Sequence, residues 1–185
     1  STGYNATFAW KMQTQNGGEA FGQTMLPHSA LLFNSTVSYM AVSAPLANDQ
    51  RGLVQFFDVP TLFALTDLKN VTRQMSKNVL EGTVPLARFG TTLAVTNKLQ
   101  SPMWAVGAPL KDRVCVFRQV VLPPGGGSWD ESRSVGCAEG VQNSHFGASM
   151  SFLETGRVAL HVGAPHDTHP KGSLMAGSVA AIPLL

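Results

Sequence analysis

The sequence predicts an all-β protein built from about three repeated units, each a small sheet of four strands. Three observations predict this class: a Phe-Gly motif, an apolar run ending in Ala-Pro and a further apolar run, which follow one another three times. The Phe-Gly motifs occupy residues 21–25, 89–93 and 146–150, and the Ala-Pro runs occupy residues 40–45, 104–109 and 160–165. A repeat of this length indicates units that bury their apolar faces against one another.

The Phe-Gly motif opens each unit. A glycine follows the aromatic residue in every copy, at Gly22, Gly90 and Gly147. Glycine at a fixed place indicates a backbone with positive φ or a close approach by another segment. We therefore expect a tight turn at the start of each unit.

The Ala-Pro run is predicted to form the central strand of each unit. Large and small side chains alternate along it, which is the period of two of a β-strand. When the three runs are aligned, one position with a large side chain holds Met40, Trp104 and Leu160, and the next such position holds Val42, Val106 and Val162. The small column holds Ala41 and Ala105, and we interpret its third member, His161, as a hydrogen-bonded core residue rather than a functional group lining a channel. The closing prolines end the strand, because proline cannot donate to a ladder.

The third apolar run, at residues 52–57, 112–117 and 177–182, is predicted as the next strand and keeps the same alternation. A sheet with two apolar faces needs a sheet on either side, which is the arrangement of blades in a β-propeller.

Polar and Pro/Gly-rich segments set the expected unit boundaries. Residues 1–20 are expected to hold the outer strand of a preceding blade, and the blades to span residues 21–88, 89–145 with a cysteine-containing insertion, and 146–185, the last being incomplete. Three blades are too few for a propeller, which has about four to eight. We therefore expect two apolar flanks, covered by remaining blades from the same protein or by another chain.

Composition excludes several classes of protein. Charged residues make up only 13% of the 185 residues, and the net charge is +2 without a basic cluster. Neither disorder nor a nucleic-acid partner is expected from such a chain. No apolar stretch approaches the roughly 20 residues of a membrane-spanning helix, so no membrane span is expected.

Cys115 and Cys137 are expected to form a disulfide, with Cys115 on a strand and Cys137 on a connecting segment. The alternative is two free thiols in a reducing compartment. Three acceptor sites for N-glycosylation, at Asn5, Asn34 and Asn70, favour the first interpretation. We therefore expect an extracellular protein or one of the secretory pathway.

One cluster of ligand-type side chains follows the last Ala-Pro pair: His166, Asp167 and His169. These residues would hold zinc only with a fourth ligand from elsewhere, and we interpret His166 and His169 instead as loop residues that contact a partner. Trp129, between a glycine run and two acidic residues, is predicted as a further partner contact. No nucleophile elbow, tuned carboxylate pair or phosphate loop is recognisable, so we expect no catalytic site and no cofactor in this chain.

Through its three ordered Phe-Gly and Ala-Pro motifs, the chain resembles the FG-GAP repeat family, whose repeats form the blades of integrin α-subunit propellers and of secreted relatives. Calcium loops of the type Asp-x-Asp/Asn-x-Asp-Gly occur in many such blades. This chain departs from that pattern, since residues 26–36, 96–102 and 153–156 lack the required acids. We therefore expect no metal.

The resemblance implies a non-catalytic extracellular propeller segment for recognition or scaffolding, with a protein or glycan ligand. A cysteine-containing insertion before a last Phe-Gly unit at Phe146 is similar to the C-terminal propeller of the glycosylphosphatidylinositol phospholipase D family. In that family, hydrolysis belongs to a separate metal-dependent domain. The alternative is an integrin α-like adhesion or structural propeller that binds other proteins.

Overall fold

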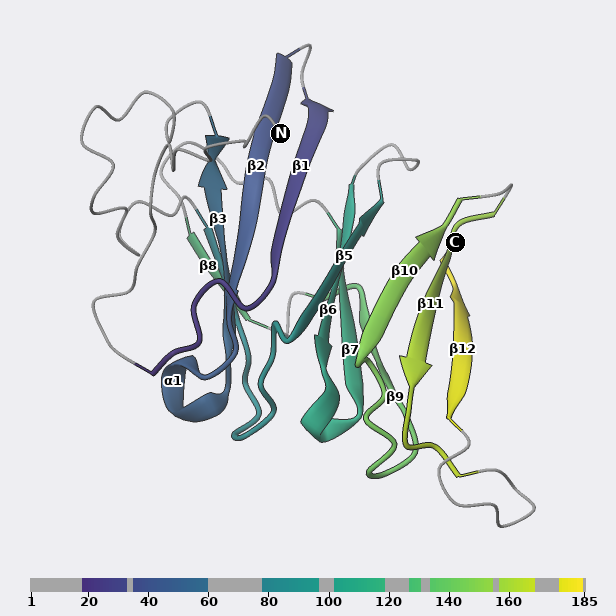
Figure 1. Ribbon diagram of the computed structural model, residues 1–185. Coiled ribbons are helices and arrows are strands. Elements are labelled where there is room, and N and C mark those ends of the chain that lie inside the picture. Colours follow the sequence, from purple (N-terminus) through teal and green to yellow (C-terminus); the bar gives the residue numbers. More distant parts are fainter. Residues whose placement is uncertain are drawn as a thin grey trace, which may run out of the picture.

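A computed structural model describes residues 18–32, 35–59, 78–96, 102–118, 127–130, 134–154, 157–168 and 177–184. Within these residues, the regular structure is almost entirely β-strand and forms three sheets (Figure 1). The prediction of an all-β chain is confirmed. The other two elements are the short segments α1 (Ala47–Gln50) and η3 (Pro109–Lys111).

The first sheet has the order β1 (Met25–Leu32), β2 (Ser35–Ala44), β3 (Leu53–Asp58), β4 (Asn78–Glu81) and β8 (Gly127–Asp130). The second has the order β5 (Thr92–Thr96), β6 (Met103–Ala108), β7 (Arg113–Arg118) and β9 (Gly136–Glu139). The third has the order β10 (Ser149–Leu153), β11 (Ala159–Ala164) and β12 (Ser178–Pro183). All neighbouring strands are antiparallel except β4 and β8.

The three units share one pairing register. The first strand of each unit meets the central strand at the same column of the repeat: Met25 opposite Val42, Leu93 opposite Val106 and Met150 opposite Val162. The Ala-Pro runs form the central strands β2, β6 and β11, as their alternation predicts. Equivalent residues therefore hold equivalent places in the three sheets.

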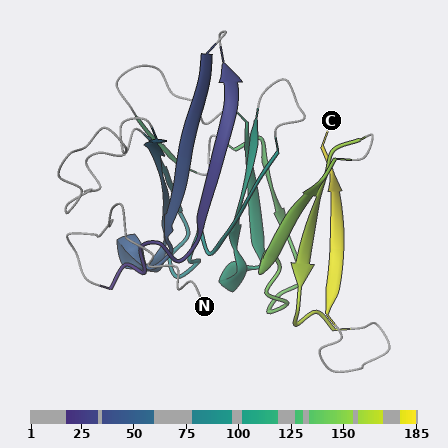
Figure 2. The same cartoon turned by 45° about the horizontal axis from the view of Figure 1, so that its top comes forward.

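The second sheet lies between the other two (Figures 1 and 2). From β6, Trp104 and Val106 share a core with Val54 and Phe56 of the first sheet. The intervening residues of β6 face the other way and share a core with Leu160 of the third sheet. Every residue of β6 is consequently buried.

The first sheet differs from the predicted four strands, because β8 adds a fifth, parallel to β4. This strand comes from the insertion between the two cysteines, which was expected to be a connecting segment. An unpaired strand edge offers a row of free N–H and C=O groups, and β8 pairs with that edge of β4. The third sheet has three strands among the described residues.

The Cys115–Cys137 disulfide is present and joins β7 to β9. Contrary to the prediction, Cys137 lies on a strand, directly opposite Cys115. Cys115 is buried in the core between the first and second sheets. The disulfide therefore fixes the outer strand of the second sheet against its neighbour.

Removing this disulfide by Cys115→Ala with Cys137→Ala is expected to lower the free energy of unfolding by about 2–4 kcal/mol, because the unfolded chain gains the freedom of the closed loop. The cysteines are 22 residues apart. Urea titration of the variant, the oxidised chain and the reduced chain provides the measurement. Equal midpoints for all three would contradict the expectation.

Tyr39 on β2 lies opposite Asp58 on β3. Burial first, and the charge of Asp58 second, raise the pKa of the Tyr39 phenol above its usual value of 10.0. The folded state therefore disfavours the ionised phenol. The contribution of the neutral phenol to the free energy of unfolding is fully present below pH 10 and is lost as pH rises through the raised pKa. We expect Tyr39→Phe to reduce the fall in Tm above about pH 10 and to change Tm little at neutral pH. An unchanged alkaline slope would argue against this assignment.

Several predicted features lie outside the described residues. They are the outer strand expected within residues 1–17, the glycosylation sites Asn5, Asn34 and Asn70, and the partner contact His169.

Candidate functional site: the joints between sheets and the outer face of the third sheet

The three Phe-Gly turns have one backbone conformation. The residue before phenylalanine has a positive φ of 52° to 55°, at Ala20, Arg88 and His145. The glycine after it has a φ of 83° to 94°, at Gly22, Gly90 and Gly147. Each glycine N–H donates to a carbonyl of its own central strand, at 2.8 Å to Ser43, 3.0 Å to Gly107 and 3.1 Å to Gly163. Glycine suits this site because an L side chain rarely adopts such a φ.

The second and third turns also contact the preceding sheet. A Cβ added at Gly90 would lie 3.0 Å from the Leu53 carbonyl oxygen and 3.0 Å from a Val54 methyl carbon. At Gly147, the corresponding distances are 3.1 Å to the Arg113 oxygen and 2.8 Å to Val114. Each turn thus leaves room for a glycine only. We call such a contact between a turn and the preceding sheet a joint.

A hydroxyl donates a hydrogen bond across each joint. The donor is the fourth residue of the Phe-Gly motif in the preceding unit. Thr24 Oγ1 donates to the Thr91 carbonyl at 2.8 Å, and Thr92 Oγ1 donates to the Gly147 carbonyl at 2.5 Å. Ser149 occupies the same motif position in the third unit.

The residue before the third strand completes each joint. It has a positive φ in all three units: 85° at Gly52, 51° at Asp112 and 68° at Gly177. At Gly52, an added Cβ would lie 2.1 Å from the Phe89 carbonyl oxygen. At the second joint, the carboxylate of Asp112 instead accepts hydrogen bonds from the turn: from the Asn143 N–H at 2.6 Å, the Ser144 hydroxyl at 3.3 Å and the Phe146 N–H at 3.3 Å.

We expect Asp112→Ala to lower the free energy of unfolding by about 2–4 kcal/mol, because it leaves the buried Phe146 N–H and the buried Ser144 hydroxyl without their charged acceptor. Asp112 is only 7% exposed. Asp112→Asn keeps one acceptor oxygen and the tolerance for positive φ, so its effect should be about half as large. Urea titration compares the two, and equal losses would contradict the expectation that the acceptor oxygen retained by asparagine contributes to stability.

The outer face of the third sheet corresponds to the faces of the first two sheets that receive a Phe-Gly turn, but this face is exposed. Val179 is 73% exposed, whereas the equivalent Val54 and Val114 are 0% exposed. His161, predicted as a core residue, is only partly buried, because it lies on this outer face. On the opposite flank, Val42 and Phe57, on the far side of the first sheet, are fully buried.

Two of the predicted partner contacts, His166 and Trp129, lie at different sheets. His166 is exposed, and its ring lies 4.2 Å from that of His145, next to the third Phe-Gly turn. Trp129 is on β8 at the edge of the first sheet, opposite Leu80. No group of three or more His, Cys, Asp or Glu side chains in the described parts of the chain is arranged to hold a metal ion.

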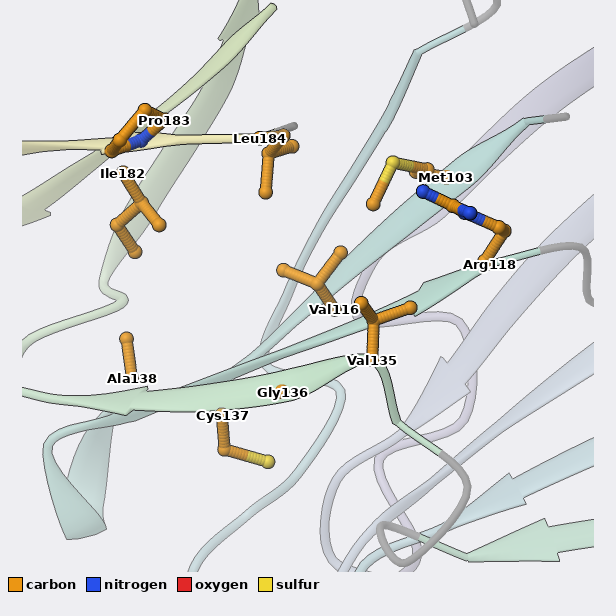
Figure 3. Close-up of a pocket in the computed structure, with 10 residues that line it drawn as sticks. All are labelled: Met103, Val116, Arg118, Val135, Gly136, Cys137, Ala138, Ile182, Pro183 and Leu184. Atoms are coloured by element: carbon orange, nitrogen blue, oxygen red, sulfur yellow. The ribbon is translucent and has the colours of Figure 1, made fainter. Parts of the chain in front are cut away.

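A cavity of about 400 Å³ lies between the second and third sheets, beside β9 and β12 (Figure 3). Figure 3 shows Ile182 and Leu184 on one side of it and Val116 and Val135 on the other. Its lining is completed by Met103, Arg118, Gly136, Cys137, Ala138 and Pro183. The sequence reasoning missed this cavity, although the third unit's lack of a predicted fourth strand was a signal for it.

No family model and no curated protein matches this chain. Of the helices in the described residues, none has the length and apolar character needed to cross a membrane.

Proposed function

We propose that the chain is a non-catalytic segment of an extracellular β-propeller, made of three FG-GAP-type blades that serve recognition or scaffolding. The observation that carries the proposal is the Phe-Gly turn, which recurs with one backbone conformation and packs twice on the preceding sheet. Joints of one kind allow similar blades to follow one another around an axis.

The polar residues of the joints support a structural role for this core. Thr24, Thr92 and Asp112 direct their side chains to backbone groups of the next turn. Such groups hold neighbouring sheets together. Specificity in a scaffold of this kind belongs to the loops at the ends of the sheets.

An extracellular location is supported by the disulfide, since disulfides persist in oxidising compartments. The predicted glycosylation of Asn5, Asn34 and Asn70 points to the same compartment.

The parent protein that we propose is a secreted protein similar to glycosylphosphatidylinositol phospholipase D. The order of the disulfide-bonded insertion and the last Phe-Gly unit supports this choice. Hydrolysis would then reside outside this chain, which would help to recognise the anchored substrate. An integrin α-like adhesion propeller is the second candidate, and the three ordered Phe-Gly and Ala-Pro units, the motifs that resemble those of integrin α blades, favour it.

Binding of the labelled, secreted chain to cells that carry glycosylphosphatidylinositol-anchored proteins tests both candidates. Loss of binding after a phosphatidylinositol-specific phospholipase C removes the anchors would support recognition of anchored substrates. Binding that survives this treatment would support the adhesion candidate, and absence of binding before treatment would contradict a role in cell-surface recognition. His166→Ala is expected to weaken binding, with Val141→Ala as an exposed control.

A further inference from the structure

The first two sheets each receive the next Phe-Gly turn at equivalent residues. Gly90 packs on the Leu53 carbonyl and on Val54, and Gly147 packs on the Arg113 carbonyl and on Val114. The strand registers identify the counterpart in the third sheet. Val54 lies opposite Ser43, Val114 opposite Gly107, and Val179 opposite Gly163. The third sheet therefore offers Val179 where the others hold a buried valine.

The polar parts of the joint recur in the third sheet as well. An added Cβ at Gly107 would lie 2.1 Å from Thr92 Oγ1, and at Gly163 it would lie 2.2 Å from Ser149 Oγ. In the second sheet, this hydroxyl donates to the carbonyl of the incoming Gly147. We call Ser149, Gly163, Gly177 and Val179 the third socket.

The third socket differs from the equivalent residues of the first two sheets in its occupant: those residues contact the Phe-Gly turn of the next unit. A Cβ at Gly52 would collide with Phe89 of the next turn, whereas at Gly177 the nearest atoms are 3.4 Å away and belong to the socket's own unit. Likewise, the space at Gly107 is bounded by the Gly147 oxygen at 2.6 Å, whereas the atoms near Gly163 all belong to Ser149. The third socket has the backbone of an occupied joint and an exposed surface.

We propose that the third socket binds a further Phe-Gly turn, carried by a repeat unit that is not part of residues 1–185. The incoming glycine packs on Val179, and an incoming backbone carbonyl accepts a hydrogen bond from the Ser149 hydroxyl. This inference rests on the proposed propeller function and names the partner of its third sheet.

The cavity beside β12 fits the same occupant. In the second sheet, β9 pairs with β7, whereas β12 is the last strand of its sheet in the part of the chain that the structure describes. A leading strand of the incoming unit, paired with β12 as β9 pairs with β7, would direct side chains toward Ile182 and Val116. Such pairing would also cover the edge of β12 that no described strand occupies.

A second copy of this chain is a poor occupant. The face that it would have to present is the far side of its first sheet, where Val42, Leu53 and Phe57 are at most 1% exposed. The Phe21 ring already lies against Phe57, at 6.4 Å between ring centroids. The Gly22 turn of a second copy is open, but the sheet face that must accompany this turn onto the socket is buried within its own chain.

An extended chain tests the proposal: residues 1–183 followed by a second copy of residues 119–185, in which Cys137→Ala removes the unmatched cysteine. The junction follows from the register, since Arg118 opposite Met103 and Pro183 opposite Ala159 end equivalent strands. Val179→Cys in the original unit provides a thiol for iodoacetamide, because the chain has no free cysteine. Val141→Cys is the matched control, since Val141 is 60% exposed and lies outside the socket.

The extension is expected to slow labelling at position 179 by about tenfold or more and to leave labelling at position 141 unchanged. Gly147→Val in the copied unit alone should restore fast labelling at position 179. Fast labelling at position 179 in the extended chain overturns the proposal. This holds even if the copied unit does not fold, because the same unit folds on the second sheet and should do so on an equivalent socket. Labelling of the unextended chain that slows with rising protein concentration identifies a second copy as occupant and also overturns it.

Amide exchange at the original Phe146, whose N–H donates to Asp112 of the second sheet at 3.3 Å, separates this result from the proposed function. Slow exchange there together with fast labelling at position 179 rejects the socket alone. Fast exchange at Phe146 would reject the stacked units, and the proposed propeller with them.

Discussion

Phe56→Ala is expected to lower the free energy of unfolding by about 3–5 kcal/mol, the typical effect of truncating a buried aromatic ring. Phe56 is 2% exposed and lies in the core between the first and second sheets. Its ring meets that of Trp104 edge to face, with 4.9 Å between centroids. The truncation therefore removes both buried area and an aromatic contact between the first and second sheets. Urea titration followed by circular dichroism measures the loss.

Phe57 provides the matched control, because it is the next residue of β3, is 0% exposed and faces the opposite side. Phe56→Ala and Trp104→Ala should be coupled by about 0.5–1.5 kcal/mol. Phe57→Ala and Trp104→Ala should be close to additive, because these residues belong to separate cores. Equal coupling in the two pairs would contradict the packing of the first sheet on the second.

The sequence predicted the parts of the fold that are encoded within one unit. Alternation along the Ala-Pro runs identified β2, β6 and β11, and the glycines of the motifs identified the turns. These signals are local, because side-chain parity and positive φ depend on the strand or turn itself.

The strands β8 and β9 were not predicted. Strand β8 forms because the insertion meets the edge of β4, and four residues carry too little alternation to reveal that pairing. Cys137 was assigned to a connecting segment for the same reason, since β9 is equally short.

The role of Asp112 was also missed, although the sequence contained a signal for it. Aligning the residues before the third strand would have placed Asp112 in a column with Gly52 and Gly177. Aspartate tolerates positive φ better than most residues, so it fits a column otherwise held by glycine. Its hydrogen bonds to the third turn follow only from the stacked arrangement.

Gly147→Ala is expected to lower the free energy of unfolding by about 3 kcal/mol, because two effects combine. Alanine at a φ of 94° is strained by about 1–2 kcal/mol. The added methyl group also lies 2.8 Å from Val114, and such overpacking costs about 1–3 kcal/mol.

Gly22→Ala separates these two effects. Gly22 occupies the same turn, with a φ of 83°, but an added Cβ would meet nothing within 4 Å. Its replacement should therefore show the backbone strain alone, about 1–2 kcal/mol. The difference between the two variants in urea titration measures how tightly the third unit is held on the second sheet. Equal losses would mean that Val114 moves aside freely, and the joint would then not restrict its glycine by contact.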